Sequence, residues 1–179
     1  MNTNKKIIQV GIGLFLITMS IFFLLFYLFS TNAGISEAQY FNYSALISCF
    51  LLPAVYAGLG FYSSYSTAKT RILHFGEVWK LTFLPMFIGG FSSLALIFLF
   101  FNKAGAWAED ALQRGWYDLM TENPNPEFME KNGELVEKMT DASINIFSLK
   151  IFFISFSVVV FYYFFISTIF AVFLRNRRV

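Results

Sequence analysis

Few side chains in this sequence have the type and spacing to do chemistry. The chain carries one histidine, His74, and one cysteine, Cys49. His74 and Glu77 stand three residues apart, so on a helical turn they would share a face and could hold a metal ion. A zinc site needs three or four protein ligands. His74 and Glu77 are only two candidate ligands, so we interpret them as part of a solvated turn that leads into the apolar segment 81–101 and not as a metal site. We therefore predict no catalytic, cofactor-binding or metal-binding residue.

Nucleophilic catalysis also lacks the residues that it needs, a nucleophile and a base close to each other. Cys49 lies in an apolar segment, where an unpaired cysteine behaves as a small apolar residue. His74 is separated from most of the acidic residues by the apolar segment 81–101, although a nucleophile and its base must lie within hydrogen-bond reach of one another. We expect that the protein is not an enzyme unless a partner chain contributes the missing groups.

The segments that carry these residues are dominated by apolar side chains. Of the 179 residues, 57% are hydrophobic and 13% are charged, whereas about 25% of a soluble domain is charged. A soluble fold of this length could not bury so much apolar side chain, and disordered chains are poor in such residues. The composition therefore indicates an integral membrane protein.

Four uncharged segments are long enough to cross a bilayer. A hydrocarbon core about 30 Å thick needs roughly 20 apolar residues in a helix. A backbone in lipid must satisfy its own hydrogen bonds, and segments without period-two alternation do so as helices. The first segment is longer than the core of a signal peptide and is expected to be retained. The sequence predicts an all-α fold, a four-helix bundle that forms a single membrane domain over residues 1–179. The spans are residues 7–29, 45–64, 81–101 and 151–174.

Basic residues indicate how the chain is oriented. Cytoplasmic segments collect Lys and Arg near the ends of spans. The segments before the first span, between the second and third, and after the fourth hold eight basic residues and one acid, Glu77. The two connections on the other side hold five basic residues and ten acids. We therefore predict that both termini are cytoplasmic, and the basic residues suit anionic lipid headgroups better than nucleic acid.

Residues 102–150 form the longest polar stretch. A structureless loop of this length is uncommon, and apolar residues recur at helical spacing from Trp107 to Trp116. Asn125 followed by Pro126 and an acid matches the start of a second helix. We predict an extracytoplasmic helical hairpin between spans three and four. It could act as a lid or docking surface, but an amphipathic hairpin that lies on the headgroups or caps the bundle explains the same pattern more simply.

Proline and small residues mark two of the spans. Pro53 is followed by Ala54 and Gly58, and Pro85 is followed by Gly89. Proline kinks a helix, and small residues four apart let helices approach closely. We expect the second and third spans to pack against each other, each with a kink. A kink could open a small cavity, but such residues are common in membrane helices in general.

Several features in order resemble a known family. Residues 74–80 read His-Phe-Gly-Glu-Val-Trp-Lys and lead into a glycine-bearing third span, residues 125–130 read Asn-Pro-Glu-Phe-Met-Glu, and the fourth span ends in a basic tail. This pattern resembles an uncharacterised family of small bacterial four-span membrane proteins, domain-of-unknown-function family 4199. The resemblance implies a bacterial inner-membrane location and a four-span topology, and it implies no mechanism and no catalytic residue.

These features predict an integral inner-membrane protein that acts as a non-catalytic structural or accessory component, through protein or lipid contacts. The expected partners are membrane lipid and either a protein partner or further copies of the chain, with no cofactor and no nucleic acid. The predicted spans contain no Asp, Glu, Lys, Arg or His, which disfavours an ion-coupled pump or a charge-selective pore. The alternative is a small transporter or channel for a neutral or lipid-like solute, with a path lined by backbone and hydroxyl groups.

Overall fold

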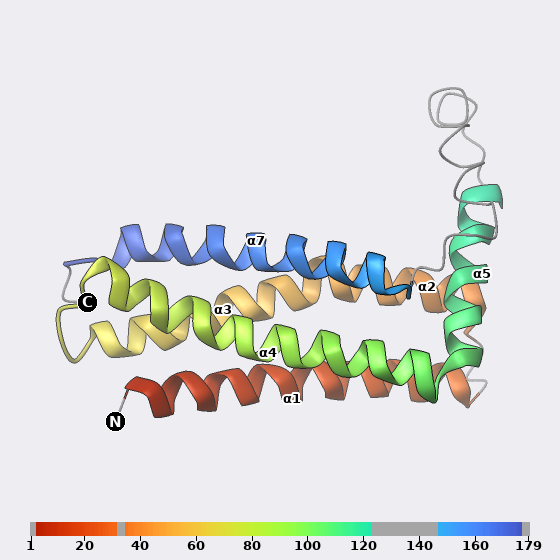
Figure 1. Cartoon of the computed structure of the whole chain (residues 1–179), viewed down its shortest axis with the longest axis horizontal. Coiled ribbons are helices and arrows are strands. Elements are labelled where there is room, and N and C mark those ends of the chain that lie inside the picture. The colour runs from red at the N-terminus through yellow and green to blue at the C-terminus, as the bar shows by residue number, and fades with distance from the viewer. Residues whose placement is uncertain (1–2, 32–34, 123–146, 177–179) are drawn as a thin grey trace, which may run out of the picture.

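The computed structural model describes residues 3–31, 35–122 and 147–176. Within these ranges every regular element is a helix (Figure 1). The helices are α1 (Thr3–Ser30), α2 (Glu37–Leu46), the π-helical turn η1 (Ile47–Leu51), α3 (Leu52–Ala68), α4 (Phe75–Lys103), α5 (Ala106–Glu122) and α7 (Leu149–Leu174).

Four helical segments are long and apolar enough to cross a membrane. They are α1, the continuous run of α2, η1 and α3, then α4 and α7. At 1.5 Å per residue, the 28 residues of α1 extend for about 42 Å, which exceeds the roughly 30 Å of a hydrocarbon core. Each of the four predicted spans lies inside one of these segments. The architecture is thus compatible with a multi-pass membrane protein.

The second long helix begins earlier than the sequence predicted. Instead of starting near residue 45, it starts at Glu37. The Ser36 hydroxyl accepts a hydrogen bond from the Gln39 main-chain N–H, and the Gln39 side chain accepts one from the Ser36 N–H. This reciprocal pair satisfies donors that the first helical turn leaves open. A search for uncharged segments excludes Glu37, although an acid in the first turn of a helix is favourable.

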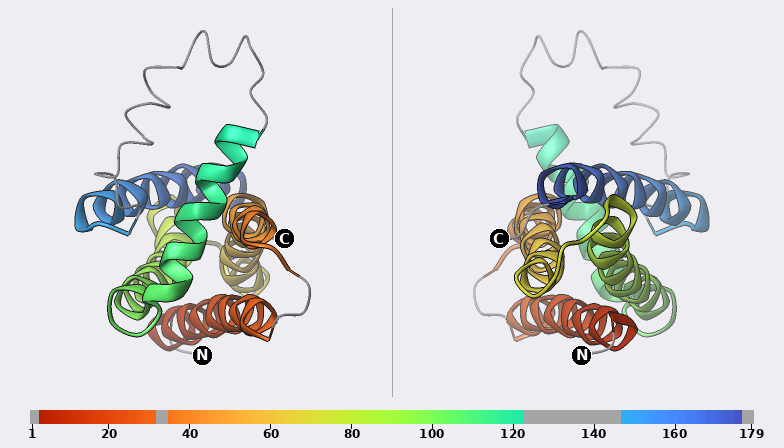
Figure 2. Two further views of the ribbon diagram at one scale, coloured as in Figure 1. Left: turned by 90° about the vertical axis from the view of Figure 1, so that its right-hand side faces the viewer. Right: turned by 90° about the vertical axis from the view of Figure 1, so that its left-hand side faces the viewer.

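The long helices pack side by side, with α4 in contact with α1, α3 and α7 (Figures 1 and 2). The first described residues of α1, the connection 69–74 and the last described residues of α7 lie together at one end, called here the termini end. The Asn176 main-chain N–H donates to the Leu73 carbonyl there, at 2.9 Å. Helix α5 crosses the opposite end, called here the α5 end (Figure 2).

Buried side chains of the long helices lie in stripes that repeat every three or four residues. Helix α7 buries Tyr163, Ser167, Ala171 and Leu174. Its other faces expose large apolar side chains such as Phe161, which is 72% exposed. Soluble proteins do not leave this much apolar surface open, whereas lipid tails solvate it without cost. The interior combines large apolar side chains, such as Leu14, Leu81 and Met86, with small and hydroxyl-bearing residues, which are common between membrane helices.

The two prolines have different local consequences. Before Pro53, the α-helical pattern gives way to η1, and the Leu52 N–H donates to the Ile47 carbonyl five residues earlier. Proline has no N–H, and its ring crowds the carbonyl four residues before it. For Pro53 that carbonyl belongs to Cys49, which lies in η1, so the wider π turn coincides with the crowded position. In α4, by contrast, the helix continues through the buried Pro85.

The predicted hairpin is described only in its first half. Helix α5 covers residues 106–122, and its buried side chains include Ala108, Ala111 and Leu112. Trp107, which the spacing placed on the same face, is 47% exposed. The predicted second helix, from Asn125 onward, lies outside the described residues. The fourth span begins at Leu149.

Candidate functional site

All four long helices contribute a hydroxyl-bearing side chain to the interior. Thr18 of α1, Tyr56 of α3, Ser93 of α4 and Tyr163 of α7 are buried. The Thr18 hydroxyl donates to the Leu14 carbonyl at 2.9 Å, so its oxygen accepts from the Tyr56 phenol, also at 2.9 Å. The rings of Tyr56 and Tyr163 are stacked in parallel planes, with their centroids 5.3 Å apart. This polar layer therefore ties α1 to α3 and α3 to α7.

Glycines bring the helix backbones close enough to form this layer. A β-carbon placed on Gly89 of α4 would lie 2.7 Å from the β-carbon of Leu14 in α1. One placed on Gly90 would lie 2.5 Å from the Tyr163 phenol oxygen. Real β-carbons do not approach other atoms this closely, so a larger residue at either position would force the helices apart. Helix α4 thus packs against α1 on one side and α7 on the other through adjacent glycines.

The close packing of α3 and α4 was predicted correctly, but from the wrong residues. Ala54 and Gly58 are both exposed, and a β-carbon on Gly58 would meet nothing within 4 Å. The contact is made by Gly60, where a β-carbon would lie 3.0 Å from the Met86 sulfur. A spacing of four residues identifies a pair that shares a face, but it does not say which face meets a neighbour.

Two interior hydroxyls have no hydrogen-bond partner among the described residues. The side chains of Ser63 in α3 and Ser167 in α7 are fully buried, and neither hydroxyl oxygen is paired. Serine in a membrane helix usually donates to the carbonyl four residues earlier, as Ser93 does to Gly89 at 2.7 Å. A buried hydroxyl without a partner is unusual and costs free energy.

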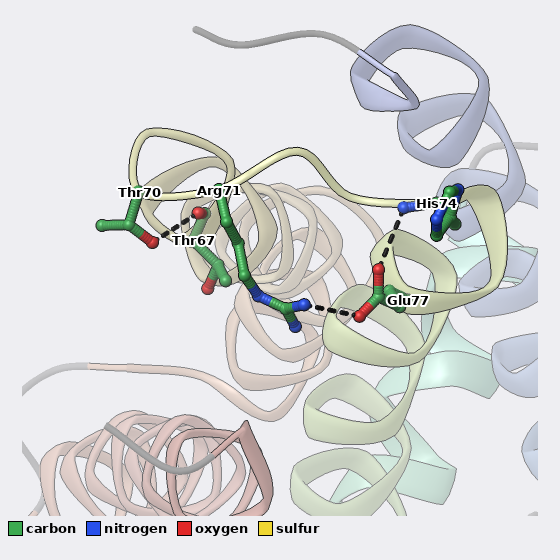
Figure 3. Close-up of polar contacts among 5 residues, drawn as sticks. All are labelled: Thr67, Thr70, Arg71, His74 and Glu77. Atoms are coloured by element: carbon green, nitrogen blue, oxygen red, sulfur yellow. Dashed lines mark hydrogen bonds and ion pairs between the residues drawn. The ribbon is translucent and has the colours of Figure 1, made fainter.

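The residues that the sequence singled out for chemistry are not part of this layer. Cys49 is exposed in η1. His74 precedes α4 at the termini end, and its main-chain N–H donates to the Glu77 carboxylate at 3.0 Å (Figure 3). The same carboxylate pairs with Arg71 at 2.8 Å. Glu77 therefore serves to start α4. In the described part of the chain, no three His, Cys, Asp or Glu side chains come together as a metal site would need.

The termini end also holds Lys6, which the sequence indicated only as a basic residue that orients the chain. Lys6 of α1 reaches the end of α3, where its Nζ lies 2.5 Å from Ser66 Oγ and 2.7 Å from Thr67 Oγ1. Thr70 Oγ1 closes the same helix end by donating to the Thr67 carbonyl at 2.8 Å (Figure 3). Residues 60 positions apart in sequence carry no local signal of such a contact.

At the α5 end, a polar clamp and an aromatic stack hold α5 against α2. Arg114 donates to both carboxylate oxygens of Glu37, each at 2.8 Å. Phe29 lies between the rings of Tyr40, with centroids 4.3 Å apart, and Trp107, with centroids 5.7 Å apart. Helix α5 is therefore fixed to the long helices by contacts of several kinds.

One comparison with known proteins identifies a family. The model of a family described as "Protein of unknown function (DUF4199)" matches residues 10–176, which is nearly the whole chain. No curated protein matches, and no solved structure matches. The family match agrees with the resemblance expected from the sequence.

Proposed function

We propose a role for this protein from the premise that it belongs to the DUF4199 family of proteins of unknown function. The role is that of a non-catalytic structural or accessory component of a bacterial inner membrane, which acts through protein or lipid contacts. The chain would form a four-helix membrane bundle with an extracytoplasmic helical element between its third and fourth spans.

The position of α5 is the observation that carries this proposal. Helix α5 lies across the ends of the long helices. The bidentate hydrogen bond from Arg114 to the Glu37 carboxylate holds it there. A bidentate arginine–carboxylate pair adds geometric specificity as well as energy. Asp110 on α5 is exposed. A helix held rigidly outside the spans supports a role in presenting a polar surface to another protein.

The charge distribution supports an orientation in which the termini end faces the cytoplasm. In the described residues, the termini end carries six basic side chains against the single acid Glu77, whereas at the α5 end the basic Lys103, Arg114 and Lys150 are matched by the acids Glu37, Glu109 and Asp110. Cytoplasmic segments are rich in Lys and Arg. Single cysteines at positions 4, 69, 132 and 176, in a Cys49→Ala background, should react with an impermeant maleimide in intact cells only at position 132. Labelling at any other position would overturn this topology.

The accessory role is tested by native mass measurement after extraction in a gentle detergent. A stoichiometric complex with another protein or with further copies of the chain is expected. Asp110→Arg should weaken a complex that uses the exposed side of α5, whereas Thr70→Arg, an exposed change at the termini end, should leave that complex intact. A strictly monomeric species without a partner would contradict the proposal.

Transport of a neutral solute is the second candidate, and one observation favours it. The unpaired hydroxyls of Ser63 and Ser167 are groups that could hydrogen-bond a passing solute. Vesicles containing the protein should then take up a small neutral solute such as glycerol faster than empty vesicles, and replacing both serines by alanine should slow this uptake. Equal uptake with and without the protein would exclude such a path for that solute.

A further inference from the structure

The Lys6 ammonium group is held by two hydroxyl oxygens of α3. Both hydroxyls donate their own protons to main-chain carbonyls, Ser66 to Tyr62 at 2.6 Å and Thr67 to Ser63 at 3.1 Å, so toward Lys6 they act as acceptors. An ammonium group has three N–H donors, and within the described part of the chain these two hydroxyls are its hydrogen-bond partners. Among the described residues, one N–H donor of Lys6 thus remains open to a further acceptor.

The positive charge of Lys6 is not balanced by a carboxylate of the described residues. The one acid that these residues place at the termini end is Glu77, which is already shared by Arg71 and the His74 main chain. Lys69 adds a second positive charge two residues after Thr67, and its Nζ lies 4.7 Å from the centre of an aromatic ring of α3. The site therefore combines excess positive charge with an open donor, and a phosphate oxygen satisfies both.

Apolar surface continues from Lys6 toward the middle of the molecule. On α1, Gly13 and Ile17 follow Lys6 on the same helical face. Ile17 is exposed, and a β-carbon at Gly13 would meet no atom within 4 Å. On α3, Tyr62 lies one turn before Ser66 and is 61% exposed. A ligand that joins a phosphate to apolar chains could use both parts of this surface, whereas free phosphate could use only the polar part.

We propose that Lys6, which Ser66 and Thr67 hold in place, binds with Lys69 the phosphodiester of an anionic phospholipid whose acyl chains lie along α1 and α3. The inference rests on the membrane location proposed above. A phosphodiester oxygen accepts the third N–H of Lys6, and Lys69 provides the second positive charge. Phosphatidylglycerol keeps a net negative charge that zwitterionic phosphatidylcholine lacks, so the site distinguishes the two lipids by net charge.

Native mass spectrometry of the full chain, titrated with phosphatidylglycerol or phosphatidylcholine of the same acyl chains, tests this site. The first phosphatidylglycerol should bind more tightly than phosphatidylcholine. Lys6→Gln should weaken phosphatidylglycerol binding about fivefold, the effect of one basic residue near an anionic headgroup, and leave phosphatidylcholine binding unchanged. Lys5→Gln removes the same charge from an exposed neighbour, and we expect a smaller effect because Ser66 and Thr67 hold Lys6 and not Lys5. Lys6→Arg keeps the charge and should keep the preference, which separates lost binding from lost folding.

Three results would overturn the site. Equal affinity of the parent protein for the two lipids would remove the preference. Equal weakening by Lys5→Gln and Lys6→Gln would reduce it to diffuse attraction. Displacement of phosphatidylglycerol by millimolar inorganic phosphate would assign the site to free phosphate. If the protein forms a stable complex with a partner but shows no lipid preference, the lipid site is wrong and the accessory role is unaffected. If the protein is strictly monomeric but prefers phosphatidylglycerol, the lipid site is supported and the accessory role is contradicted.

Discussion

The Tyr162 phenol of α7 donates a hydrogen bond to the main-chain carbonyl of Pro53, at 3.1 Å, across 109 positions of sequence. Pro53 is the second residue of α3 and is separated by Leu52 from the end of η1, where the α-helical pattern is interrupted. Because Tyr162 belongs to α7, this bond holds the start of α3, just after the π turn, against α7. The irregular segment is therefore anchored at its proline.

Tyr162→Phe should remove this anchor and little else. We expect the free energy of unfolding to fall by about 1 kcal/mol, as for loss of a hydrogen bond between membrane helices. Amide hydrogen exchange at residues 47–52 should become faster. Tyr62→Phe, at a largely exposed tyrosine of α3, is the control and should change neither quantity. Unchanged exchange in Tyr162→Phe would show that the π turn does not depend on this bond.

Gly89→Ala and Gly58→Ala form a matched pair. At Gly89 the new methyl group would meet Leu14 and the Gly11 carbonyl, whereas at Gly58 it would meet nothing within 4 Å. We expect Gly89→Ala to destabilise the protein by about 1–3 kcal/mol, the usual cost of overpacking. Gly58→Ala should be neutral or slightly stabilising, because alanine favours helix more than glycine does. Unfolding titrations in detergent would measure both, and equal effects would contradict the packing of α4 on α1.

Gly115→Ala tests the attachment of α5. A β-carbon at Gly115 would clash with the Glu37 carbonyl of α2, a main-chain group that cannot move aside independently. We expect α5 to be displaced from α2 and limited proteolysis between residues 104 and 122 to become faster. Gly76→Ala, at a glycine of α4 with open space around it, provides the control. Proteolysis at the parental rate in Gly115→Ala would mean that α5 and α2 do not pack so closely.

Arg71→Gln and Glu77→Gln test the start of α4. The ion pair is partly exposed, with side-chain exposures of 49% and 37%, so breaking it should cost only about 0.2–1 kcal/mol. Glu77→Gln also weakens the acceptor for the His74 N–H, which Arg71→Gln leaves intact. Amide exchange at His74 should therefore accelerate more in Glu77→Gln than in Arg71→Gln. The same acceleration in both variants would indicate that the ion pair, and not the carboxylate alone, holds this turn.

The amino-acid sequence was sufficient to predict the number and approximate limits of the long helices. An uncharged segment of 20 or more residues has few stable forms in lipid, and this constraint needs no knowledge of neighbouring helices. The start of the second helix was misplaced because its first two turns hold an acid and several polar residues, among them Glu37, Gln39 and Asn42, which a criterion of apolar length leaves out. The family resemblance could also be seen in short motifs, and the family match over residues 10–176 confirms it.

Only the tertiary structure decided which small residues pack and which polar groups meet. Gly58 and Gly60 look alike in sequence, but only Gly60 faces α4. The contacts of Lys6 with Thr67, and of Arg114 with Glu37, join residues more than 60 positions apart. Local periodicity fixes the apolar faces of a helix with respect to its own axis. The rotation of that axis against its neighbours depends on the packing of all the helices together, and this packing determines the polar contacts at both ends.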